Sequence, residues 1–105
     1  MSNYGQYYQP QQQGPVFNLL ARGSGIDSNE YDSITRAATR AYTERKQPLS
    51  QNTVKYIKAA IGGEWFVLEN PKNMTNYDFT LSVVTGNDFL SFTLDNIHFQ
   101  VCRLK

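Results

Sequence analysis

Chemically reactive side chains are scarce in this sequence. The 105 residues include one cysteine, Cys102, and one histidine, His98. A single cysteine excludes an intramolecular disulfide and is typical of a reducing compartment. The two side chains lie four residues apart on a predicted strand, about 13 Å by rise alone, so they cannot share a metal ion. The sequence therefore predicts no metal site, no cofactor and no catalytic residues.

Charge and long apolar stretches are also limited. The formal net charge is +1, whereas phosphate binding usually needs a basic face, so we expect no nucleic-acid partner. No apolar run approaches the ~20 residues that span a bilayer. The N-terminus has no charged start followed by an apolar stretch, which argues against a signal peptide. We therefore expect no membrane association and a cytoplasmic location.

The chain divides into a tail and one domain. A length of 105 residues fits one domain rather than two. Residues 1–15, MSNYGQYYQPQQQGP, are rich in Gln, Tyr, Gly and Pro and carry no charged side chain. This composition buries too little apolar surface to offset the entropy of ordering. We predict a solvated tail over 1–15 and a folded domain over 16–105. The alternative is a tail that orders against a neighbour in a larger assembly.

The spacing of apolar residues predicts two helices in the first half of the domain. Residues 28–44 carry apolar side chains at helical spacing, and so do residues 50–61. Ser50 is a suitable N-cap for the second helix. Gly62-Gly63 is expected to end it.

The remaining chain alternates between apolar and polar residues, as half-buried strands do. His98 falls on the more polar face of the last strand, and we interpret it as a surface or interface histidine. Helices that are segregated from a run of strands indicate an α+β fold, with two helices packed on an antiparallel sheet. The predicted strands are Val16–Leu20, Trp65–Leu68, Phe79–Val84, Phe89–Leu94 and Ile97–Leu104.

Four landmarks carry a resemblance to a known family. Val16–Asn18 resembles its first strand, and Ser33–Ala38 resembles the start of its first helix. Ile57–Ile61, followed shortly by Trp65, resembles the end of its second helix and the tryptophan that opens the next strand. Asp78–Arg103 matches its last three strands without a gap. In order and spacing, the predicted domain resembles the small cytoplasmic dynein light chains, the eight-kilodalton hub type.

The resemblance implies a protein that is not an enzyme. Members form symmetric dimers in which one strand crosses to the partner's sheet, and extended peptides pair with that strand by β-strand addition. Trp65 and Phe66 lie at the implied dimer interface. The implied crossing and peptide-pairing strand consists of Asp78, Phe79, Thr80, Leu81, Ser82, Val83 and Val84. The implied groove wall consists of Ser50, Gln51, Asn52, Lys55, Ser91 and Thr93.

The sequence departs from the family pattern at two of these places. Phe66 stands where the family has an interface histidine, and Val83-Val84 stands where it has a Thr-His pair. The implied partners are dynein intermediate or heavy chains or other light chains, in a homodimer or heterodimer. The implied location is the cytoplasm and cytoskeleton, including a ciliary or flagellar axoneme.

Two other functions stay open from the sequence. One is a structural module fixed in a large cytoskeletal or ciliary assembly, anchored partly by its N-terminal tail and without peptide-hub activity. The other is a small-molecule enzyme or carrier that uses a cavity between the sheet and the helices.

Overall fold

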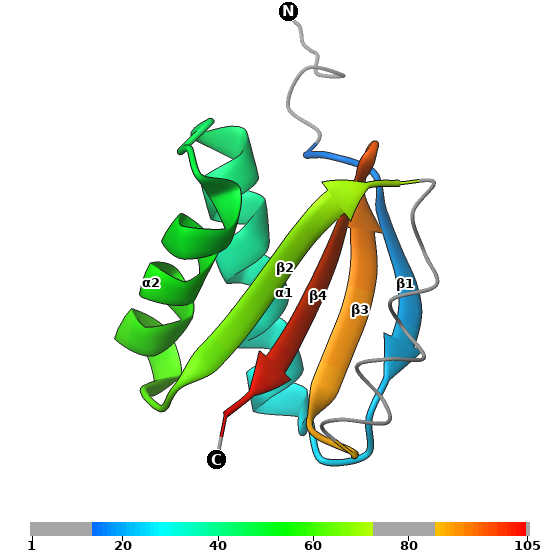
Figure 1. The fold of residues 1–105 in the computed structure, drawn as a ribbon, viewed down its shortest axis with the longest axis vertical. Helices are drawn as coiled ribbons and strands as arrows, with labels where there is room; N and C mark the ends of the chain where they lie inside the picture. The colour runs from blue at the N-terminus through cyan, green and yellow to red at the C-terminus, as the bar shows by residue number, and fades with distance from the viewer. Residues whose placement is uncertain (1–13, 73–85, 105) are drawn as a thin grey trace, which may run out of the picture.

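Two helices pack on one face of a four-stranded antiparallel sheet (Figure 1). The computed structural model describes residues 14–72 and 86–104, and all statements below concern these residues. The predicted α+β fold is confirmed. The elements, in chain order, are β1 (Phe17–Arg22), α1 (Ser28–Thr43), α2 (Leu49–Ile61), β2 (Trp65–Pro71), β3 (Phe89–Leu94) and β4 (Ile97–Arg103).

The strands are arranged in the order β1-β3-β4-β2. β3 and β4 form a hairpin at the centre, closed by a turn in which Asp95 has a φ of 52°. β1 pairs with β3, and β2 pairs with β4, so β1 and β2 are the two edge strands. β2 and β3 run in the same direction, and therefore β2 ends and β3 begins at opposite ends of the sheet.

Both ends of α1 are satisfied by the local sequence. Asp27 accepts a hydrogen bond from the Glu30 N–H, and the Glu30 side chain accepts one from the Asp27 N–H, which forms a capping box. At the other end, the N–H groups of Arg45 and Lys46 donate to carbonyls of the last turn. Arg45 has a φ of 55°, a left-handed conformation that glycine usually takes at this position.

The hydrophobic core lies between the sheet and the helices. Phe92 and Phe99 are fully buried and face each other across the β3–β4 hairpin, with stacked rings 5.4 Å apart. α1 contributes four buried residues that recur at helical spacing. Alternation along β3 and β4 directs every second side chain into this core, as the sequence predicts. The α1 residues in the core are Ile34, Ala37, Ala38 and Ala41.

The observed bounds differ from the predicted ones mainly at the edge strands. β1 extends to Arg22 and contains a bulge between Leu19 and Ala21. The strand ends just before Gly23, where a Cβ atom would overlap the carbonyl oxygen of Asn87. β2 continues three residues past its predicted end at Leu68, because pairing with β4 holds its polar end in the ladder. The predicted strand Phe79–Val84 lies outside the described residues.

Candidate functional site

The outer edge of β2 is one place where a further strand can add to the sheet. Glu64 C=O accepts from Leu104 N–H, and Lys72 N–H donates to Asn96 C=O. Residues of an antiparallel strand alternate in the direction of their backbone groups. The even-numbered residues of β2 therefore bond to β4, and the N–H and C=O groups of Val67 and Glu69 point away from it. No strand within 14–72 or 86–104 pairs with this edge.

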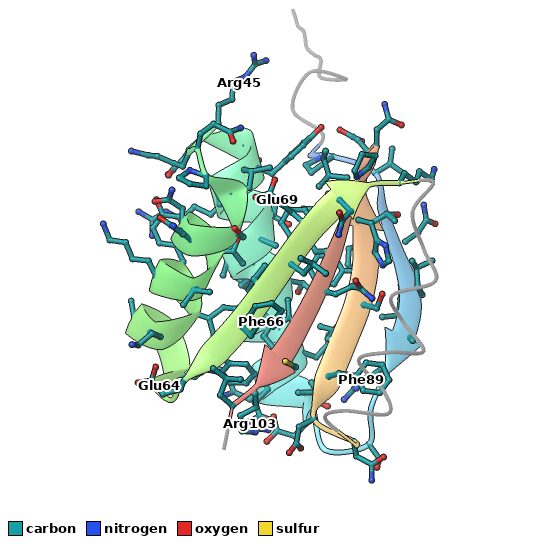
Figure 2. The ribbon with its side chains drawn as sticks, viewed as in Figure 1. Arg45, Glu64, Phe66, Glu69, Phe89 and Arg103 are labelled. Atoms are coloured by element: carbon teal, nitrogen blue, oxygen red, sulfur yellow. The ribbon has the colours of Figure 1, made fainter. Side chains whose placement is uncertain are left out.

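The two predicted interface residues of β2 point to opposite faces of the sheet. Trp65 is buried on the helix side, where its Nε1–H donates to the Gly62 carbonyl at 2.7 Å. The Arg103 guanidinium lies 4.9 Å from its ring centroid. Phe66 lies on the other face and is 44% exposed (Figure 2). Of the pair, Phe66 alone offers exposed apolar surface beside the β2 edge.

The start of α2 lies against β2, but its backbone is partly occupied. Ser50 N–H donates to Glu69 Oε1 at 2.6 Å, which links the first turn of α2 to the edge strand (Figure 2). The prediction of Ser50 as N-cap is wrong: α2 begins at Leu49, and Pro48 holds the cap position without a side-chain bond. The physical reason is that a carboxylate 19 residues further along the chain satisfies this N–H instead.

The other predicted groove residues of α2 are more open. Asn52 Nδ2–H donates to the Pro48 carbonyl at 3.0 Å. Gln51 and Lys55 are exposed on the helix surface. A partner that approaches this end of α2 therefore meets an amide and an ammonium group, whereas the Ser50 N–H is already bonded.

Ser91 and Thr93 lie on the sheet face opposite the helices, away from the predicted groove residues of α2. They alternate with Leu90, Phe92 and Leu94, which face the helices, so the strand itself separates the two groups. The structure thus brings together the four groove residues of α2 and places the two of β3, both buried, on the opposite face of the sheet. The predicted crossing strand, Asp78–Val84, lies outside the described residues.

The face opposite the helices carries a buried polar cluster. Ser91, Thr93, His98 and Gln100 are each at most 2% exposed. Ser91 Oγ and His98 Nε2 are hydrogen-bonded at 2.7 Å. His98 is therefore not a surface residue: its side chain is 0% exposed, and β3 and β2 flank its strand on both sides. The sequence places His98 on the more polar face of its strand, but the pattern does not indicate that any of the four is buried.

Cys102 and Phe89 form a small apolar cluster at one end of the same face. The two residues are partners in the β3–β4 register. Burial raises the pKa of the Cys102 thiol, which keeps it protonated and weakly nucleophilic. Cys102 packs as a small, buried apolar side chain.

A cleft of about 720 Å³, which the sequence does not predict, lies at the end of the molecule near the α1–α2 connection. Tyr42 O–H donates to Asp95 Oδ2 at 2.8 Å, and this bond raises the pKa of the tyrosine. Val16 N–H donates to Asp95 Oδ1 at 2.8 Å, which lowers the pKa of the carboxyl. The Asp95 carboxylate thus links α1 and the residue before β1 to the β3–β4 hairpin. The cleft is lined by Gly14, Pro15, Tyr42, Thr43, Arg45, Gln47, Leu49, Asp95 and Ile97.

Metal ligands do not cluster in the part of the chain that the structure describes. There, no three side chains of His, Cys, Asp or Glu come close enough to hold an ion together. Among these same residues, no helix has the length and apolar character needed to cross a membrane. Comparison with models of known protein families gives no match to this chain. A search of curated protein sequences likewise finds no similar one.

Proposed function

We propose that this chain is a non-catalytic subunit of dynein light chain type, which dimerises and binds extended segments of motor or axonemal proteins by β-strand addition. The observation that carries the proposal is the position of β2 at an edge of the sheet, with backbone groups of Val67 and Glu69 directed outward. Such an edge is a template for a strand from another chain.

The side chains of β2 favour an added strand that covers one face more than the other. Trp65 and Val67 are already buried against the helices. Phe66 and Leu68 point to the opposite face, where Phe66 is exposed and Leu68 is half-buried. Covering Phe66 would remove apolar area from water, at about 25 cal/mol per Å². Backbone pairing would supply the direction and register of the added strand, and Phe66 would supply apolar contact.

We assign the crossing role to Asp78–Val84. This segment belongs to the connection between β2 and β3. The connection runs from one end of the sheet, where β2 ends, to the other end, where β3 begins. Its sequence gives one apolar face, because every second residue is apolar. Phe79, Leu81 and Val83 alternate with Thr80, Ser82 and Val84. In this proposal the segment pairs with the β2 edge of a second copy or of another light chain, and a partner peptide pairs with the segment.

The start of α2 offers a bound peptide fewer open backbone donors than a free helix N-terminus would. The Glu69 carboxylate already accepts the Ser50 N–H, so a bound peptide would compete with an internal anion for that donor. We therefore propose that affinity comes mainly from backbone pairing along the strand. The partners in this proposal are dynein intermediate or heavy chains or other light chains, in the cytoplasm, the cytoskeleton or an axoneme.

The proposal is tested by matched substitutions at the two sheet edges. Phe66 on β2 and Leu20 on β1 are 44% and 43% exposed. Phe66→Asp is expected to shift the protein from dimer to monomer in sedimentation equilibrium, because it places a charge in the interface. Leu20→Asp is the control and should leave the dimer intact. Wild-type protein that is monomeric at all concentrations contradicts the dimer.

The partner class needs a separate experiment. The full chain, immobilised and exposed to ciliated-cell extract, should retain dynein intermediate or heavy chains, and Leu81→Pro in the proposed crossing strand should abolish this retention. Deletion of residues 1–13 should not affect it. Loss of retention on that deletion, with Leu81→Pro harmless, would instead support a structural module anchored by its tail.

A further inference from the structure

Among the described residues, the opposite edge of the sheet also has backbone groups that pair with no strand, and it has its own apolar surface. Asp95 N–H donates to Val16 C=O, and Gly23 N–H donates to Phe89 C=O. With the observed β1–β3 register, alternation directs the N–H and C=O groups of Phe17 and Leu19 away from β3. β1 is an edge strand of the described sheet. Of the five exposed large apolar residues in 14–72 and 86–104, three lie on β1 or precede it: Val16, Leu19 and Leu20.

A groove lies beside this edge, between β1 and α1. Its volume is about 270 Å³. The Phe17 ring packs edge-on to Tyr31 at 6.3 Å and forms the apolar floor. A strand that pairs with β1 would direct alternate side chains to the helix side, where the groove can receive one of them. The lining residues are Phe17, Tyr31, Thr35, Arg36 and Thr39.

One arginine, Arg36, lines this groove. A second, Arg22, lies outside the lining: its guanidinium is 4.9 Å from the Tyr31 ring centroid and donates to the Ile26 carbonyl. Arg36 pairs with Asp32 at 2.8 Å, but the two side chains are 79% and 58% exposed. Exposed pairs of this kind contribute little free energy, so a carboxylate from another molecule can exchange with Asp32 at Arg36. The charge at the rim therefore favours an acidic residue in the occupant.

We infer that the β1 edge is a second docking surface, which takes an extended segment of a partner protein with an apolar residue and an acidic residue two positions apart. Residues two apart on a strand face the same side. The apolar side chain would enter the groove over Phe17 and Tyr31, and the carboxylate would meet Arg36. The bulge at Leu19–Ala21 limits regular pairing to the first half of β1, so the paired segment is short.

A synthetic peptide tests this inference on the full chain. The probe is the blocked heptapeptide Thr-Val-Thr-Glu-Thr-Val-Thr, titrated into ¹⁵N-labelled protein. The largest amide shifts are expected at Phe17, Leu19 and the groove-facing residues of α1. Two further peptides carry N-methyl groups that remove the backbone N–H donors of one edge of the peptide strand or of the other. Only one peptide edge pairs with β1, so one N-methylated peptide should lose binding and the other should keep it.

Charge variants then test the role of Arg36. Arg36→Glu is expected to weaken binding of the Glu peptide by about fivefold, the range of an exposed ion pair, and to strengthen binding of the matching Lys peptide. Asp32→Asn should strengthen binding of the Glu peptide. Lys46→Glu, a charge reversal at an exposed site just after α1, should change neither affinity.

Three results would overturn the inference. The first is a set of shifts confined to β2. The second is that Arg36→Glu leaves the affinities of both peptides unchanged. The third is a set of shifts at β1 that grow with protein concentration in the absence of peptide, which would assign this edge to a second copy of the chain. Peptide binding at β2 alone would leave the proposed function standing, so the two proposals fail separately.

Discussion

The two faces of the central hairpin are both buried but differ in chemistry. On the helix side, Phe92 and Phe99 stack within a continuous apolar core. On the other side, Ser91, Thr93 and His98 are buried as deeply but are polar. Burying apolar side chains stabilises a fold without regard to direction, whereas buried polar groups stabilise it only when their hydrogen bonds are made. The comparison suggests that the helix face provides stability and the polar face fixes one arrangement of the chain.

The largest effect is expected on the helix face. Phe99→Ala should lower the free energy of unfolding by about 3–5 kcal/mol, because it removes a fully buried ring from the stack with Phe92. Urea denaturation measures this loss. Phe66→Ala, at an exposed ring, is the control and should lose far less. If Phe99→Ala loses no more stability than Phe66→Ala, the helix face is not the main source of stability.

Removing the Glu30–Arg103 ion pair on the helix face should lower the free energy of unfolding by an amount that depends on pH. Arg103 pairs with Glu30, and this hydrogen bond lowers the pKa of Glu30 below its ordinary value of 4.5. The pair therefore stabilises the fold above that value, and this contribution is lost as pH falls through the lower pKa of the folded state. Glu30→Gln keeps the capping geometry and should lower stability by about 2 kcal/mol at neutral pH.

Denaturation as a function of pH checks the sign of this effect. The difference between Glu30→Gln and wild type should shrink as the pH falls below 4.5. Asp32→Asn, which removes an exposed pair with Arg36, is the control and should change stability little. A constant difference down to pH 2 would contradict the assignment to charge.

On the polar face, a single hydrogen bond should have a smaller effect. Ser91→Ala removes the hydroxyl that bonds His98 Nε2 at 2.7 Å and is expected to lower stability by about 1 kcal/mol. Calorimetric or urea unfolding of the variant measures it. Unchanged stability would show that this bond adds nothing to the fold, and the role assigned to the polar face would have to be abandoned.

The smallest effect has the opposite sign. Thr93 Oγ1 is buried, and no hydrogen-bond partner for it is found in the described part of the chain. Thr93→Val keeps the shape and removes the hydroxyl, so it should raise stability by about 0.5 kcal/mol. Thr35→Val is the contrast, because Thr35 Oγ1 donates to the Tyr31 carbonyl; that variant should lose stability. A loss at Thr93 would mean that its hydroxyl makes a bond in solution.

The sequence predicts the centre of this fold better than its edges. Phe89–Leu94 is predicted with the bounds that β3 has, because strict alternation and flanking turns define it locally. The extra length of β2 depends on pairing with β4, since Glu69, Asn70 and Pro71 do not form strands by preference. A local pattern cannot report a distant partner: Asn70 pairs with His98, which lies 28 residues further along the chain.

The candidate site is predicted less well, for the same reason. The Glu69 bond to Ser50 N–H joins residues 19 apart and overrides the local preference of serine for an N-cap. Whether a polar face is covered also depends on distant contacts, and so the burial of His98 could not be predicted. The groove beside β1 combines residues of β1 and α1 that show no common pattern in the sequence.

Amide hydrogen exchange along β2 tests the central claim most directly. Leu68 N–H lies on the side of β2 that bonds to β4, whereas Val67 N–H points outward. If another strand adds to this edge, the Val67 N–H should exchange as slowly as the Leu68 N–H in the wild-type chain at dimer-forming concentration. It should exchange faster in Phe66→Asp. Fast exchange of Val67 at every concentration, beside a protected Leu68, would show that the β2 edge stays open and would contradict the proposed function.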